Sequence, residues 1–268
     1  VVENCSFYNQ YNCIYYTGAQ FQITRGNAFE AWVNNALTAV SFGSVEANGG
    51  VITENLFFGE SAAATTQPAC IDMGVGYSEI TKNVILGSQV GLYIRPGLPG
   101  GIGENNASHL ISGNVFEEQA IGSINFSPAG KPLVSVVIQG NQFSNISNVG
   151  STFQAHITMT AGATAWLRSV VVADNVFNSF LTGTASAYIN CQTGQSVKIT
   201  GNIIDNNSAS TNPIGIVIAS TVASPCLIEN NIIRAITAQY NISSTAARVV
   251  DMIGMTVANL PGTLADGS

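Results

Sequence analysis

Two residues with titratable rings, His156 and Tyr188, suggest acid–base chemistry in the middle of this chain. An imidazole can abstract a proton and a phenol can return one to a departing oxygen, provided that both groups meet the same molecule. Asn125, Asn190 and Arg168 come from the same part of the chain and could bind a carboxylate on that molecule. The pattern predicts an elimination beside a carboxylate, with His156 or Tyr188 as the base and Tyr188 as the acid.

Carboxylates offer a second kind of chemistry, the hydrolysis of a glycosidic bond. The candidates are Asp72, Glu117, Glu118 and Asp205. Hydrolysis needs two carboxyl groups about 5–10 Å apart, one as the acid and one as the nucleophile or base. Glu117 and Glu118 are adjacent, so on a strand they would point to different faces. No pair within one chain is convincing, and a pair between two copies of the chain stays open.

A short repeated sequence motif indicates the fold that positions these residues. Each copy has an apolar residue, an asparagine a few positions later, and Phe or Ile two residues after the asparagine. The clear copies centre on Asn27, Asn55, Asn83, Asn114, Asn141, Asn175, Asn202 and Asn231, and a weaker copy begins at Val1. The asparagine recurs after 28, 28, 31, 27, 34, 27 and 29 residues. Such a period, with runs of β-branched and aromatic residues, indicates a solenoid of stacked β-coils.

Over about residues 1–235 the motif and its spacing resemble the right-handed parallel β-helix of pectate lyases and phage tailspikes. The resemblance implies an all-β, single-chain solenoid of about nine coils with three short strands each. We expect the Asn at a turn, where it can adopt a left-handed backbone and where its amide can bond to the next coil's Asn as a ladder. We place the β-helix at residues 1–240 and a C-terminal extension at 241–268, and we interpret the abrupt ends as those of a fragment.

The third strand of each coil locates an outer face, because alternate residues on a strand point to opposite sides. Aligned on a small first residue, these strands have an inward third position: Thr38, Ile71, Tyr93, Ile124, Ile157, Ile189 and Val217. The second and fourth positions should then face solvent. In the middle coils this predicts one outward patch, with the last residue at its edge: Ser123, Asn125, His156, Thr158, Tyr188, Asn190 and Gln192. An aromatic ring among amides and hydroxyls suits a sugar, although an ordinary solvated face would look the same, and a one-residue slip would turn these side chains inward.

An insertion between coils carries two further candidates, Trp166 and Arg168. The tryptophan ring could stack on a sugar, and contact with another subunit explains it equally well. His109 falls in a column with Val136 and Val170, which favours a hydrogen-bonded core histidine over a catalytic one.

Composition argues against several other classes. The formal charge is −7, whereas binding a nucleic-acid backbone needs rows of Lys and Arg. No apolar run is long enough for a membrane span. The five cysteines show no CxxC motif and no clustering with histidine, so we expect no metal ion and no cofactor. We expect Cys191 and Cys226 to be buried free thiols.

Together with the resemblance, these residues imply a phage tailspike-like protein that binds a bacterial surface polysaccharide, a capsule or O-antigen, and depolymerises it by hydrolysis or β-elimination. Two alternatives stay open: a non-catalytic receptor-binding or structural β-helix of a virion, and a free enzyme resembling pectate lyases or epimerases. The resemblance also implies a homotrimer located on a virion tail or outside the cell.

Overall fold

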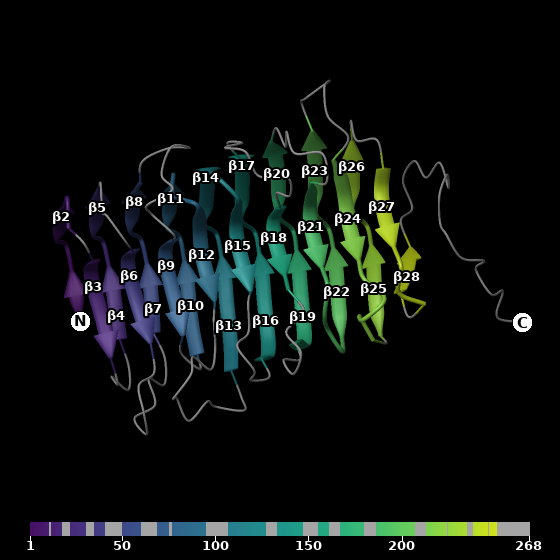
Figure 1. The fold of residues 1–268 in the computed structure, drawn as a ribbon, viewed down its shortest axis with the longest axis horizontal. Coiled ribbons are helices and arrows are strands. Elements are labelled where there is room, and N and C mark those ends of the chain that lie inside the picture. Colours follow the sequence, from purple (N-terminus) through teal and green to yellow (C-terminus); the bar gives the residue numbers. More distant parts are fainter. Residues whose placement is uncertain are drawn as a thin grey trace, which may run out of the picture.

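The chain winds into a solenoid in which three parallel β-sheets surround one elongated core (Figure 1). The structure is a computed structural model. It describes residues 1–10, 12–17, 22–30, 35–40, 50–59, 69–74, 77–94, 107–126, 133–146, 155–160, 167–179, 186–206, 213–223, 225–234, 238–245 and 247–250. These residues form strands, turns and bends, and none of them is helical.

Each coil contributes one strand to each sheet. Sheet A has 10 strands: β1 (Val2–Glu3), β4 (Gln22–Arg25), β7 (Gly50–Thr53), β10 (Tyr77–Thr81), β13 (Ala107–Ser112), β16 (Leu133–Gln139), β19 (Leu167–Ala173), β22 (Val197–Thr200), β25 (Cys226–Glu229) and β28 (Ala247–Val250). Sheet B has 9 strands: β2 (Ser6–Tyr8), β5 (Ala28–Glu30), β8 (Leu56–Phe58), β11 (Val84–Leu86), β14 (Val115–Gln119), β17 (Gln142–Ile146), β20 (Val176–Ser179), β23 (Ile203–Asn206) and β26 (Ile232–Arg234). Sheet C has 9 strands: β3 (Asn12–Thr17), β6 (Asn35–Val40), β9 (Ala69–Gly74), β12 (Val90–Ile94), β15 (Gly122–Phe126), β18 (Ala155–Met159), β21 (Ala187–Cys191), β24 (Ile214–Ile218) and β27 (Ala238–Ile242).

The chain passes from sheet A to sheet B to sheet C and back, which gives the predicted right-handed parallel β-helix. The solenoid continues past the predicted boundary at residue 240. β27 ends at Ile242, and β28 pairs in parallel with β25, for example Ile228 with Val249. The predicted extension therefore begins inside β27 of sheet C and includes β28 of sheet A, and its last residues, 251–268, lie outside the described part of the chain.

A left-handed residue turns the chain from sheet A into sheet B. Its φ angle runs from 54° at Asn4 to 66° at Gly201. The residues at this position are Asn4, Gly26, Glu54, Lys82, Gly113, Gly140, Asp174, Gly201 and Asn230. Each directly precedes the residue at the ladder position, which is Cys5 in the first coil and the repeated asparagine in the others. The prediction that the asparagine itself adopts the left-handed backbone is therefore wrong. The left-handed position instead takes glycine in four coils, because glycine has no Cβ to clash there.

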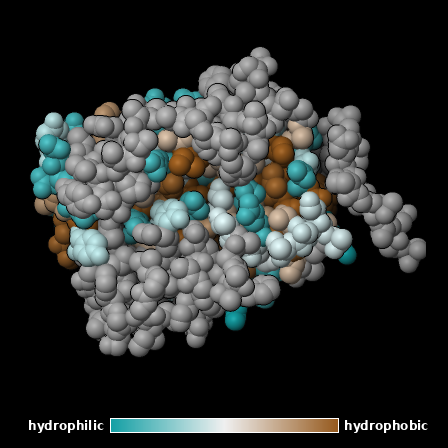
Figure 2. Space-filling model, viewed as in Figure 1, coloured by the Kyte–Doolittle hydropathy of each residue, from teal (hydrophilic) through white to brown (hydrophobic). Residues whose placement is uncertain are grey.

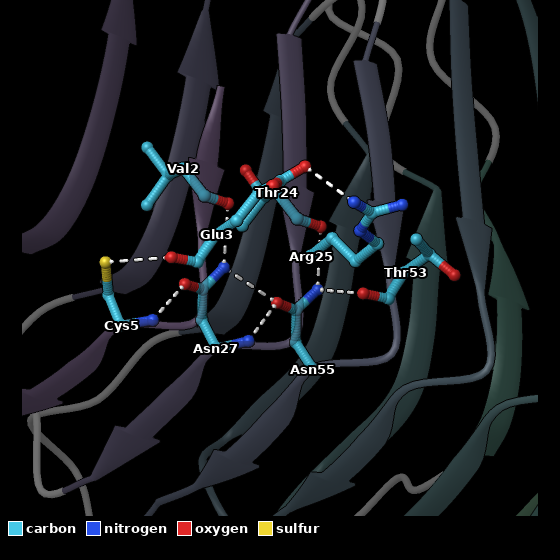
Figure 3. A network of polar contacts seen from close by, with 8 residues as sticks. All are labelled: Val2, Glu3, Cys5, Thr24, Arg25, Asn27, Thr53 and Asn55. Atoms are coloured by element: carbon cyan, nitrogen blue, oxygen red, sulfur yellow. Dashed lines mark hydrogen bonds and ion pairs between the residues drawn. The ribbon is translucent and has the colours of Figure 1, made fainter.

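The predicted asparagine ladder is present on the inner side of this turn (Figure 3). Asn141 shows the pattern: its Nδ2 donates to Asn175 Oδ1 at 3.0 Å and to the Ile111 carbonyl at 3.0 Å. Its Oδ1 accepts from the backbone N and from Nδ2 of Asn114, at 2.9 and 3.0 Å. In the first coil Cys5 occupies this position, and its backbone N donates to Asn27 Oδ1 at 2.9 Å. Each buried amide is thereby bonded to the coils on both sides.

The core follows the pleat of the three sheets. Stacked phenylalanines fill the inner side of sheet B, with Phe29 and Phe57 4.6 Å apart and Phe143 and Phe177 4.6 Å apart between ring centroids. Aliphatic side chains fill sheets A and C. Cys191 and Cys226 are buried free thiols, as predicted.

Candidate functional site on the outer face of sheet C

Five polar side chains form a continuous outer column on sheet C, here called the sheet C column: Asp72, Tyr93, Asn125, Thr158 and Asn190. They pair in register across β9, β12, β15, β18 and β21. Their chain neighbours at the third and fifth positions, such as Ile124 and Phe126, are fully buried. Because side chains alternate along a strand, the column must point away from the core. Asn125, Thr158 and Asn190 therefore share the outer face that the sequence predicted for them.

The register corrects three coils of the sequence alignment. In the first of them Leu37, and not Thr38, pairs with Ile71, and Thr38 pairs with Asp72. Leu92 pairs with Ile71 and Ile124, so Leu92 is the core residue and Tyr93 belongs to the outer column. Ile216 pairs with Ile189 in the same way, which places Val217 outside. The alignment failed because it took Ala36, Gly91 and Gly215 as first residues. The first paired residues are Asn35, Val90 and Ile214.

The middle residues of the sheet C column are accessible to solvent, whereas the residues at its two ends are buried. Tyr93, Asn125 and Thr158 are partly exposed, whereas Asp72 is only 4% exposed and Asn190 only 2%. Two of its atoms, Asn125 Oδ1 and Asn190 Nδ2, are withdrawn from solvent without a hydrogen-bond partner. A buried polar atom without a partner costs about 1–3 kcal/mol, so a ligand hydroxyl that reached these atoms would recover binding free energy.

A second, shorter outer row lies beside the column. Thr160 and Gln192 follow the inward residues Met159 and Cys191, and both are partly exposed. Their backbone N atoms donate to the preceding coil, Thr160 to Phe126 at 3.0 Å and Gln192 to Met159 at 2.9 Å. Gln192 therefore lies at the edge of the polar face, as predicted, and Thr160 extends it. In Figure 2, hydrophilic and intermediate residues lie among hydrophobic ones along the middle of the visible face.

The second positions of these strands are buried, contrary to prediction. Ser123, His156 and Tyr188 are each 0% exposed. The parallel pairing passes from Ala155 and Ala187 directly to Ile157 and Ile189 and omits the residues between them. We interpret this interruption, at the start of the sheet C strand, as a bend, because the second and third residues are both buried and both face the core. The strict alternation assumed from the sequence fails at this bend.

Inside the solenoid these three residues are packed and hydrogen-bonded. His156 Nδ1 lies 3.0 Å from Ser123 Oγ, and Ser123 Oγ also donates to Gln119 Oε1 at 3.1 Å. The His156 ring lies 5.5 Å from Phe143 and 5.7 Å from Tyr188. Burial lowers the pKa of His156 to about 3. His156 and Tyr188 are neighbours, as predicted, but they face the core and cannot meet a polymer outside the solenoid.

His109, the other histidine, is also a core residue, as predicted. It is 2% exposed, and its Nδ1 lies 2.6 Å from Ser78 Oγ. Burial lowers its pKa to about 4. The structure therefore places both histidines of the chain where they can pack but cannot act as bases on a large external substrate.

The four candidate carboxylates do not come together. Asp72 lies on sheet C, whereas Glu117 and Asp205 lie on the outer side of sheet B, paired with Leu86 and Asn178 respectively. Glu118 is exposed with a left-handed φ of 59°. Asp205 also pairs with Arg234 in the next coil. Asp72 therefore lies on a different sheet from the other three acids, and it has no second candidate acid beside it in the sheet C column.

Two binding candidates lie elsewhere. Arg168 is exposed on β19 of sheet A, so it does not belong to the sheet C column. Trp166 lies outside the described residues. Among those that are described, no group of three His, Cys, Asp or Glu side chains could hold a metal ion. In the same part of the chain, no helix has the length and apolar character to cross a membrane.

A separate hollow lies outside the turn between sheets A and B near the N-terminal end. It encloses about 580 Å³ and is lined by Leu56, Val84, Glu54 and Lys82, among other residues. Glu54 and Lys82 approach to 3.9 Å, but both are exposed and contribute little binding free energy. None of the residues lining this hollow has a buried polar atom without a partner. The sheet C column is therefore the stronger candidate.

Tyr93 and Thr160 are the outer-face residues that sequence analysis missed. The signal for Tyr93 was present in Val90-Gly91-Leu92-Tyr93-Ile94, where the apolar residues at positions 90, 92 and 94 alternate with Gly91 and Tyr93. The fold and this face define a class, a parallel β-helix with a polar outer column. No protein-family model, no curated protein and no solved structure matches the chain.

Proposed function

We propose that this chain binds a bacterial surface polysaccharide on the outer face of sheet C. The observation that carries the proposal is the sheet C column, in which polar side chains from five consecutive strands share one face. Amides, a hydroxyl and a phenol supply the hydrogen bonds and the flat apolar surface that sugars require. Such a face runs over five strands of the solenoid, which suits a polymer better than a small metabolite.

Binding is better supported than cleavage. The elimination mechanism predicted for His156 and Tyr188 requires both rings to contact the polymer, and both rings are buried in the core. Asp72 is the only carboxylate in the sheet C column, and hydrolysis needs a second one. Depolymerisation therefore enters the proposal only as activity at a groove between copies of the chain, in a homotrimeric, tailspike-like assembly on a virion tail or outside the cell.

The test is a binding screen against capsular and O-antigen polysaccharides, with Thr158→Val as the site variant. Thr200→Val is the matched control, because Thr200 is a partly exposed threonine on the outer side of sheet A. We expect at least one polysaccharide to bind the wild type and the control alike and to bind Thr158→Val more weakly. Equal binding by all three proteins would place the site elsewhere, and no binding across a broad panel would refute the proposal.

The same samples report on cleavage. Size exclusion would detect shortening of the polysaccharide, and ultraviolet absorbance would detect the unsaturated sugar that an elimination leaves. Binding without shortening would support a receptor-binding role. Shortening without ultraviolet absorbance would direct mutagenesis to Asp72 and to the acids of sheet B.

A further inference from the structure

We infer that the ligand of the sheet C column is an uncharged, extended glycan that lies along the solenoid axis with one sugar residue per coil. This inference rests on the proposed function. It adds the charge of the polymer and its direction on the protein, neither of which follows from the fold alone.

The direction follows from the spacing of the column. Tyr93, Asn125 and Thr158 lie on adjacent strands and are paired in register. Adjacent strands are about 4.8 Å apart, so the face offers one polar side chain about every 4.8 Å along the axis. This spacing is close to the length that one pyranose residue adds to an extended polysaccharide. Among the described residues the polar face is two residues wide across a strand, as at Thr158 and Thr160, whereas along the axis it spans five strands, so the axial direction offers the longer row of contacts.

The charge follows from the side chains on this face. The described outer positions from β9 to β24 include no lysine and no arginine, and Asp72 lies at one end of the column. The whole chain carries a formal charge of −7. A polymer with carboxylate groups would carry charge of the same sign as the whole chain and would find no lysine or arginine at the described outer positions, so Coulomb repulsion would oppose its binding. This argues against the carboxylate-binding role predicted for Asn125 and Asn190.

The two atoms without partners give an independent reason. Asn125 Oδ1 can only accept a hydrogen bond, whereas Asn190 Nδ2 can only donate one. They belong to strands two steps apart, roughly 10 Å along the axis. Sugar hydroxyls can donate and accept, so one neutral polyol satisfies both atoms. A carboxylate can accept from Asn190 but has no proton to give to Asn125.

The first experiment compares polymers that differ only in charge. Hyaluronan and other acidic polysaccharides that pass the screen would be measured beside their carboxyl-reduced forms, at low and high salt. We expect the reduced forms to bind at least about tenfold more tightly than their parents, a difference of about 1.4 kcal/mol, with little dependence on salt. Tighter binding of the acidic parent, weakened by salt, would overturn this inference and leave the proposed function intact. Failure of every glycan to bind would refute both.

The second experiment tests the direction with neutral oligosaccharides of increasing length, prepared from the tightest-binding polymer. We expect affinity to rise with each sugar until about three to five coils are covered. A plateau at two sugars would show that the glycan crosses the face instead. This measurement uses the wild-type chain, so it does not depend on the folding of any variant.

A pair of substitutions tests the hydrogen-bond roles. Asn125→Asp keeps an acceptor at Asn125 and should retain binding of the neutral glycan, whereas Asn125→Leu should lose it. Asn190→Asp removes the donor and should also lose binding. A melting curve of each variant separates loss of binding from loss of folding. Retained binding by Asn125→Leu in a folded protein would contradict the assignment.

Discussion

Acid should destabilise this solenoid well above the pH at which its carboxylates titrate, because both of its histidines are buried. The chain has two histidines, and burial lowers the pKa of His109 to about 4 and that of His156 to about 3. In the unfolded chain the pKa of each is about 6.5. Between pH 6.5 and 4 the unfolded state therefore binds more protons than the folded state. The free energy of unfolding must fall as pH is lowered through this window.

The magnitude can be worked from these pKa values. Below pH 6.5 each histidine lowers the free energy of unfolding by up to about 1.4 kcal/mol per pH unit, so the two together give about 2.7 kcal/mol per unit. Between about pH 7.5 and pH 5 the summed loss is about 4 kcal/mol. That is a large part of the 5–15 kcal/mol by which a typical protein is stable. Carboxyl groups with ordinary pKa values near 4 contribute little above pH 5.

The assay is denaturant unfolding from pH 7.5 to 5, with proton uptake on unfolding measured in weak buffer at about pH 5. We expect uptake close to two protons per chain. His156→Phe should remove about one of them and halve the slope. Gln142→His is the control, because Gln142 is exposed on sheet B and a histidine there should keep its ordinary pKa. Uptake well below one proton, or an imidazole NMR signal of the native protein that titrates above pH 5.5, would refute the reasoning.

Three further predictions concern the packing of the coils. Asn141→Ala removes the side-chain hydrogen bonds of one interior rung of the ladder and leaves their buried partners unsatisfied. Denaturant titrations should therefore show a free energy of unfolding lower by about 3–5 kcal/mol. A loss under about 1 kcal/mol would show that the ladder contributes little to stability. Gly122→Ala would place a Cβ 2.6 Å from a backbone carbonyl oxygen of β18 and should lower the free energy of unfolding by about 1–3 kcal/mol. At Gly50 the nearest atom to an added Cβ is 3.7 Å away, so Gly50→Ala should leave the free energy of unfolding unchanged or raise it by up to about 1 kcal/mol. The same titrations would contradict this reasoning if Gly50→Ala proved the more destabilising of the two. Of the five cysteines Cys5 is exposed, Cys13 is partly exposed and the other three are buried. Burial raises the pKa of Cys13 to about 11 and that of Cys70 to about 12, so a thiol reagent should label Cys5 rapidly, Cys13 slowly and the three buried cysteines only on unfolding.

The fold could be predicted from the sequence because each coil repeats the same local pattern. The asparagine and the Phe or Ile two residues later recur at nearly constant spacing, and both point into the core, as at Asn141 and Phe143. The conformation of the turn was misassigned, although the sequence carried the signal. Gly26, Gly113, Gly140 and Gly201 each precede a ladder asparagine, and glycine is the residue that a left-handed position favours.

The site could be predicted only where strands alternate regularly. Asn125, Thr158 and Asn190 lie beyond the bend, in the regular part of their strands, and their outward direction was read correctly. Ser123, His156 and Tyr188 lie at the bend between sheets B and C. The direction of a side chain there depends on the angle at which two sheets meet, which is a property of the packed solenoid and has no signature in a single strand.

The asparagine ladder has a direction, and that direction makes each coil an interchangeable unit. From Asn27 to Asn202 each rung donates its side-chain N–H to the following asparagine and accepts from the preceding coil, as Asn141 accepts from Asn114 and donates to Asn175. The chain tolerates a spacing of 27 residues from Asn114 to Asn141 and of 34 from Asn141 to Asn175. Duplication or loss of one whole coil would leave a free donor facing a free acceptor, and the ladder would close again. Recombination between repeats could therefore lengthen or shorten the outer face in steps of one strand while the interior keeps its packing.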